Sequence, residues 1–147
     1  MKKIGLIFLF AAAVYVSKAQ GSSQDRQAIQ MLGEFYRAYN RVWSTSANQN
    51  VLLKKLDSLQ RIYFTKRMIS EINSSGLDED PLVGTSYTDV EHLKTLEITR
   101  DPQRENAYIV SYIAHVTSNP DEPFDEKVVI HVTVEEEDSR LKIASVL

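Results

Sequence analysis

Apolar residues recur every three or four positions over residues 24–43, which predicts an amphipathic helix. Serine 22 or 23 would cap this helix, and Asp25 would lie in its first turn, near the positive end of the helix dipole. We expect the side that carries Phe35, Tyr39 and Trp43 to pack on the rest of the domain. The apolar positions are Ile29, Leu32, Phe35, Tyr36, Tyr39, Val42 and Trp43.

Two shorter helical patterns follow a polar loop at residues 44–50. The first spans Val51 to Leu59, and the second would be capped by Thr65 and ended by Gly76. The two could run together near Ile62. Residues 74–89, rich in Gly, Asp, Ser and Pro, then predict an irregular connection.

The period of the pattern changes to two after this connection. Alternating or β-branched residues predict strands near residues 95–99, 108–117, 128–134 and 141–143. The short segments between them are rich in turn-forming residues, so consecutive strands should form an antiparallel meander. We therefore predict an α+β fold, with N-terminal helices packed on a four-stranded antiparallel sheet.

The first 19 residues have the pattern of a secretory signal peptide. Lys2 and Lys3 precede an apolar run from Ile4 to Val16, and small residues stand near a cleavage point after Ala19. This run is shorter than the roughly 20 residues that cross a bilayer, which argues against a permanent membrane anchor. We expect an exported protein, periplasmic or secreted, whose single domain covers residues 20–147.

Removing the signal peptide leaves 14 basic and 20 acidic residues, a net charge of −6. The basic residues are scattered, whereas nucleic-acid binding relies on clustered Lys and Arg, so we expect no nucleic-acid partner. The chain has no cysteine, which excludes disulfides and thiol chemistry. A domain of about 128 residues is large enough to be stabilised by its core alone.

The stretch LDEDPLVGTSYTDVEHLKTL at residues 77–96 resembles the signature region of an exported bacterial family, domain of unknown function 3828. The similarity in pattern extends from the aromatic residues of the opening helix to LKIASV at residues 141–146. It implies a cystatin-like or nuclear-transport-factor-2-like curved sheet around a helix, with no assigned activity. The matching positions are Asp78, Asp80, Pro81, Tyr87, Asp89 and Leu93.

Acidic residues in this stretch are the first candidates for a binding site. Asp78, Glu79 and Asp80 could offer oxygen ligands to calcium, but their spacing does not match a calcium-binding loop, which favours a solvated or helix-capping turn. Asp89 would cap a helical turn that begins at residue 90. A recognition loop would use Asp78, Asp80, Tyr87 and Asp89.

Histidines on the predicted strands are the second candidates. A turn at residues 119–122 would place His131 opposite residue 110 or 111 and His115 opposite Glu126 or Lys127. The two histidines would then lie about 13 Å apart along the sheet, too far to share a metal ion. Ser111 and His131 would be close neighbours. A nucleophilic enzyme needs such a pair, but a polar sheet face also explains it.

The sequence contains no recognisable catalytic, metal or cofactor motif. Aromatic residues Tyr36, Tyr39, Trp43, Tyr108 and Tyr112 could line a cleft between helix and sheet, although core packing explains their spacing better. We therefore expect a non-catalytic envelope domain that binds a protein or small ligand without a cofactor. The alternative is a small hydrolase or isomerase with an acid–base site in the helix–sheet cleft.

Overall fold

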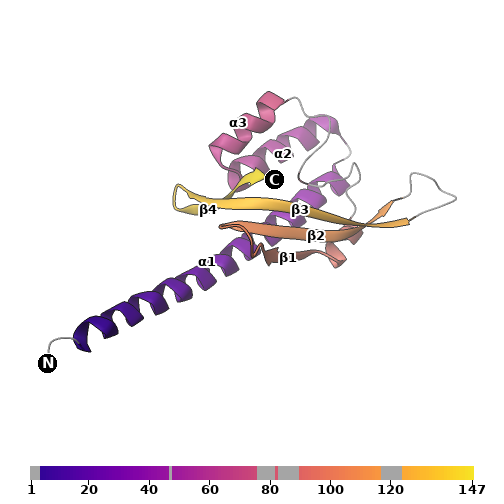
Figure 1. Ribbon diagram of the computed structural model, residues 1–147. Helices are drawn as coiled ribbons and strands as arrows, with labels where there is room; N and C mark the ends of the chain where they lie inside the picture. Colours follow the sequence, from indigo (N-terminus) through magenta and orange to yellow (C-terminus); the bar gives the residue numbers. More distant parts are fainter. Residues whose placement is uncertain (1–3, 47, 76–81, 83–89, 117–123) are drawn as a thin grey trace.

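The computed structural model describes residues 4–46, 48–75, 82, 90–116 and 124–147, with side chains from Ser23 onward (Figure 1). Helices α1 (Ile4–Thr45), α2 (Gln49–Tyr63) and α3 (Lys66–Ser75) precede a 3₁₀ turn, η1 (Val90–Lys94). Four strands follow: β1 (Glu97–Arg100), β2 (Ala107–Val116), β3 (Phe124–Glu137) and β4 (Arg140–Val146). They form one antiparallel sheet in the order β1-β2-β3-β4, which confirms the predicted α+β meander.

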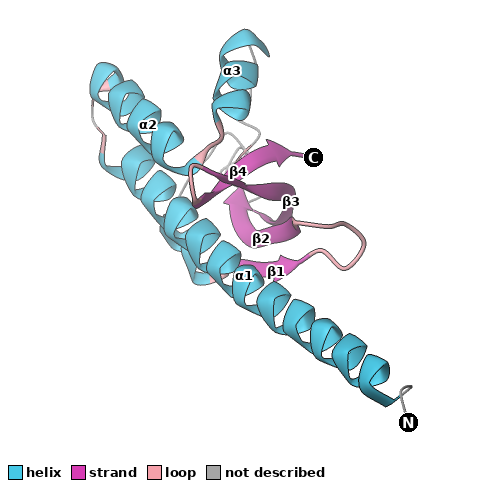
Figure 2. Cartoon of the chain, turned by 90° about the vertical axis from the view of Figure 1, so that its left-hand side faces the viewer, coloured by secondary structure: helices cyan, strands magenta, loops and turns pink. Residues whose placement is uncertain are grey.

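The two faces of this sheet differ in their surroundings. The helices lie on one side of it (Figure 2). The side chains directed toward the helices are buried, because β strands alternate their residues between the two faces. These are Tyr108, Val110, Tyr112 and Ala114 on β2, and Val128, Ile130, Val132 and Val134 on β3.

The centre of the core is an aromatic cluster around Phe35 of α1. The Phe35 side chain is fully buried, and its ring centroid lies 5.2 Å from those of Tyr36 and Phe64. Tyr39 and Tyr63 lie 5.4 Å and 5.5 Å away. These separations fall in the range that favours aromatic pairs, so the cluster joins α1 to the end of α2.

Trp43 departs from the expected packing. It follows Tyr39 by one turn, with the two rings 6.4 Å apart, but it is 38% exposed. The prediction that Trp43 packs into the core was therefore wrong. The buried part of the α1 face ends at Tyr39 and Asn40.

The start of α1 also differs from the prediction. With the leader attached, the helix is continuous from Ile4, so residues 22 and 23 lie inside it. Their capping of a helix that begins after residue 19 stays a prediction. Asp25 accepts a hydrogen bond of 3.0 Å from the Tyr108 hydroxyl and lies 3.5 Å from Arg100. Burial, reinforced by Asp25, raises the pKa of Tyr108 to about 12. This contact ties α1 to the first two strands.

α2 and α3 are separate helices because the chain between them joins the sheet. Phe64 forms a parallel bridge with Ile143, and the Thr65 amide donates to the Ile143 carbonyl at 3.0 Å. The Thr65 hydroxyl accepts from the Met68 amide at 3.2 Å, which confirms its predicted role as the cap of α3. The outer edge of β4 is thereby paired at this point.

We predict that Phe35→Ala lowers the free energy of unfolding by about 3–5 kcal/mol, the usual cost of truncating a buried large aromatic side chain. Chemical denaturation measures this loss. Trp43→Ala is the matched control, and it should cost distinctly less because Trp43 is partly exposed. A loss below about 1 kcal/mol for Phe35→Ala would contradict the central position of this ring.

Candidate functional site

The residues proposed from sequence divide into two groups. Asp78, Asp80, Tyr87 and Asp89 lie outside the described residues. Ser111 and His131 lie on the sheet face that points away from the helices. We call this surface the open face and define it by Ile109, Ser111, Ile113, Val129 and His131.

The open face carries exposed apolar side chains. Ile113 is 37% exposed and Val129 is 49% exposed, whereas Ile109 and His131 are half-buried. Ser111 is buried, since its short side chain lies among larger neighbours. The strands alternate as the sequence predicted, but apolar residues occur on both of their faces.

The pairing register differs slightly from the predicted one. His131 lies opposite Ile109, and Ser111 lies opposite Val129. Ser111 and His131 are thus diagonal neighbours, and no hydrogen bond joins them among the contacts of the described residues. The expected position of His131 opposite residue 110 or 111 was wrong because the paired residue numbers sum to 240.

His131 has an acidic partner that the sequence did not suggest. Its Nδ1 lies 3.3 Å from Oδ2 of Asp101, a buried residue directly after β1. The other oxygen of Asp101 accepts from the Gln103 amide at 2.9 Å, which forms an Asx turn. The hydrogen bond from the Gln103 amide holds the pKa of Asp101 below its usual value, with smaller contributions from His131 and Arg104. The turn therefore orients a carboxylate toward the imidazole.

The three histidines occupy separate surroundings. His115 lies opposite Asp125, not residue 126 or 127, with Nδ1 and Oδ1 2.7 Å apart. His92 is buried and stacks on Tyr112 at a centroid distance of 5.3 Å. The described residues contain no group of three or more His, Cys, Asp or Glu suited to holding a metal ion.

Four of the aromatic residues between helix and sheet are buried in the part of the chain that the structure describes. Tyr36, Tyr39, Tyr108 and Tyr112 are all at most 4% exposed and belong to the core cluster. Core packing is therefore the correct interpretation of these four aromatic residues.

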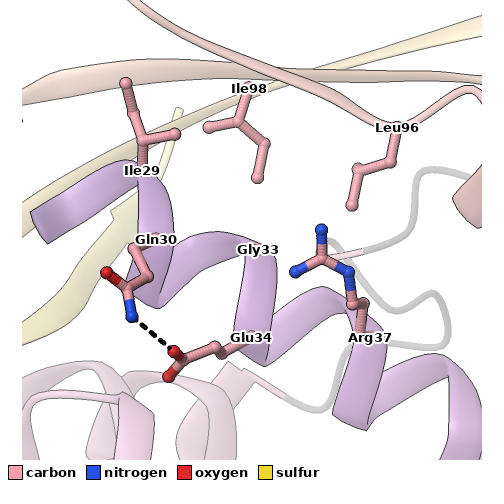
Figure 3. A pocket seen from close by; sticks show the side chains of 7 residues that line it. All are labelled: Ile29, Gln30, Gly33, Glu34, Arg37, Leu96 and Ile98. Atoms are coloured by element: carbon pink, nitrogen blue, oxygen red, sulfur yellow. Dashed lines mark hydrogen bonds between the residues drawn. The ribbon is translucent and has the colours of Figure 1, made fainter. Parts of the chain in front are cut away.

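A groove lies at the side of this interface, between α1 and β1, with a volume of about 490 Å³ (Figure 3). Its polar residues come from α1. Its apolar residues come from α1 and from the segment that leads into and forms β1. The Arg37 guanidinium points toward Leu96 and Ile98. The lining residues are Ile29, Gln30, Gly33, Glu34, Arg37, Leu96 and Ile98.

Gly33 provides room for this guanidinium. A β-carbon at Gly33 would lie 3.2 Å from Nη1 of Arg37 and 3.8 Å from Cδ1 of Ile98. Glycine inside a helix costs about 0.5–1 kcal/mol relative to alanine. Sequence analysis missed this groove, although Gly33 and Arg37 are four residues apart and therefore adjacent on one helical face.

Comparison with solved structures gives a clear match of fold. The chain resembles a crystal structure from Bacteroides thetaiotaomicron described as a protein of unknown function, with a TM-score of 0.76. The match has 24% sequence identity and covers 91% of this chain and 98% of the other. No protein-family model matches the chain, and a search of curated proteins finds no similar sequence. The likeness shows a shared α+β fold.

Within the part of the chain that the structure describes, no helix combines the length and apolar character needed to cross a membrane.

We predict that the melting temperature of Asp101→Asn falls less on acidification than that of the wild type. A carboxyl group whose pKa is lowered by folding stabilises the protein above the unfolded pKa, near 3.8, and loses this contribution as pH falls through the folded pKa. The melting temperature of the variant should therefore lie below that of the wild type at pH 7 and approach it below about pH 4.

Asn retains an oxygen for the Gln103 amide but lacks the negative charge near His131. Asp125→Asn is the control, since its pair with His115 is exposed and should affect the melting temperature little. A difference between wild type and Asp101→Asn that stays constant from pH 7 to pH 3 would show that ionisation of Asp101 is irrelevant to stability.

Proposed function

We propose that this chain is an exported, non-catalytic domain that binds a protein partner in the cell envelope through the open face. The observation that carries the proposal is the exposure of Ile113 and Val129 on the face away from the helices. Exposed apolar side chains grouped on one surface are typical of interaction sites.

A protein suits this surface better than a small molecule does. Small-molecule sites are usually concave and enclose most of their ligand, whereas the open face is one side of a sheet. Three of its five members are aliphatic, and His131, held by Asp101, adds a polar group that can fix the orientation of a partner. The half-buried Ile109 lies directly opposite His131, so apolar and polar contacts would be adjacent.

The alternative, a small hydrolase or isomerase with an acid–base site in the helix–sheet cleft, receives less support. Packed rings surround Phe35 between helix and sheet, where that site would lie. The His131–Asp101 pair orients an imidazole, but Ser111 does not hydrogen-bond to it. An activated nucleophile normally lies within hydrogen-bond reach of its base.

Two further parts of the proposal rest on sequence. The resemblance to domain of unknown function 3828 favours a cystatin-like or nuclear-transport-factor-2-like domain, and the leader favours export to the periplasm or beyond the cell. An acidic recognition loop at Asp78, Asp80, Tyr87 and Asp89 would be a second contact region for the same partner. Like the open face, it would act without a cofactor.

The open face can be tested with Val129→Lys. The variant should fold, because Val129 is 49% exposed, but it should capture at least about tenfold less of a partner from native envelope extracts. Val51→Lys is the matched control on α2, where Val51 is 45% exposed. Quantitative mass spectrometry compares the two captures. If wild type and both variants capture the same amounts of every partner, the open face is not the binding surface.

Export can be tested by intact mass. We predict that the protein recovered from outside the cytoplasm begins at Gln20, because Ser17 and Ala19 are the small residues that signal peptidase reads. Ala19→Arg should block this cleavage, because a long charged side chain replaces one of the two small residues. A mature product that retains Lys2 and Lys3 would contradict this prediction.

A further inference from the structure

We infer that the groove between α1 and β1 is a second binding site, separate from the open face, for a small organic acid: a carboxylate on a short apolar chain. The groove combines one cationic side chain, Arg37, with apolar walls from Ile29, Leu96 and Ile98. Its volume of about 490 Å³ falls within the range of about 300–1,000 Å³ that is usual for small-ligand sites.

The charged end of the ligand is assigned by the arrangement around Arg37. Its guanidinium points into the groove toward Leu96 and Ile98 (Figure 3). No carboxylate forms an ion pair with Arg37 among the described residues. A guanidinium can bind a carboxylate through two parallel hydrogen bonds, which makes a carboxylate the matching group.

Glu34 is the acidic residue that would compete with such a ligand. It lies three residues before Arg37, a spacing at which helix side chains can pair. Its carboxylate instead accepts a hydrogen bond of 3.0 Å from Gln30, and Figure 3 shows this pair directed away from Ile98 and Leu96. The negative charge in the groove is therefore held apart from the guanidinium.

The apolar end of the ligand is assigned by the opposite wall. Leu96 and Ile98 flank the groove and are both half-buried, as is Ile29 on α1. A chain lying along these residues would bury further apolar surface while its carboxylate contacts Arg37. Gly33 leaves space beside the guanidinium, since a β-carbon there would lie only 3.2 Å from Nη1 of Arg37 and would touch Ile98 at 3.8 Å.

Titration with octanoate, followed by calorimetry and amide chemical shifts, tests this site on the chain from Gln20 onward and on the full chain. We expect saturable binding in the micromolar to millimolar range, with shifts concentrated at Gly33, Arg37 and Ile98. Octanol, which has the same chain without the charge, should bind at least about tenfold more weakly. No saturation by octanoate up to about 10 mM would overturn the proposal.

Three variants distinguish binding at this site from non-specific hydrophobic binding. Arg37→Gln should weaken octanoate binding at least about tenfold and leave octanol unchanged, because it removes only the ion pair. Gly33→Ala should weaken both ligands. Arg41→Gln is the matched control, an exposed arginine one turn further along α1 and outside the groove.

Melting temperatures equal to or above that of the wild type would show that these variants are folded. Equal octanoate affinity in wild type and Arg37→Gln would overturn the proposal, as would chemical shifts confined to Val129 and the open face. Neither result bears on partner capture by the open face, since Val129→Lys leaves the groove intact. Failure of one site is thus distinguishable from failure of the other.

Discussion

The packing of Phe35 is the contact on which the rest of this structure depends. Its ring touches aromatic neighbours on α1 and at the end of α2, so one side chain fixes the helix that covers the sheet and the point where the chain leaves α2. Phe64, one of those neighbours, also bridges to Ile143 of β4. Helix α1, the α2–α3 connection and the sheet all meet at this cluster. The same contacts therefore pack the core and hold these elements together. Around Phe35 the described side chains are closely packed, and the two candidate binding regions lie outside this cluster.

Much of this architecture follows from the sequence. The change of hydrophobic period after residue 89 separates helices from strands. Asp138 and Ser139 lie between the last two predicted strands, and they adopt the positive φ angles of 53° and 61° found in tight hairpins. The sequence did not show whether α2 and α3 are separate helices. Their separation depends on the hydrogen bond from the Thr65 amide to the Ile143 carbonyl, which joins residues far apart in the chain. Periodicity reports only local preference. It could not show that Trp43 is partly exposed.

The candidate site was less predictable than the fold. Ser111 and His131 were placed on the correct strands, but a register error of one or two residues was enough to change their neighbours. Asp101 lies in a short segment between two predicted strands, and its contact with His131 arises only when the β1–β2 hairpin lies beside β3. The groove depends on Leu96 and Ile98 approaching α1 from more than 50 residues away in the chain. Such contacts have no periodic signature.

The hydrogen bond from the Thr65 amide to the Ile143 carbonyl also affects how the edge of the sheet can meet other chains. Unpaired strand edges invite other chains to add to a sheet, and proteins shield them with short strands, charges or covering segments. Phe64 and Thr65 cover part of the β4 edge, whereas β1 at the other edge is only four residues long, with Glu97 and Arg100 at its ends. The β2–β3 ribbon that extends beyond both carries Asp125, Glu126 and Lys127. These features disfavour pairing of the sheet edges with other chains, and they lower the risk of exposing the aliphatic side chains of the open face.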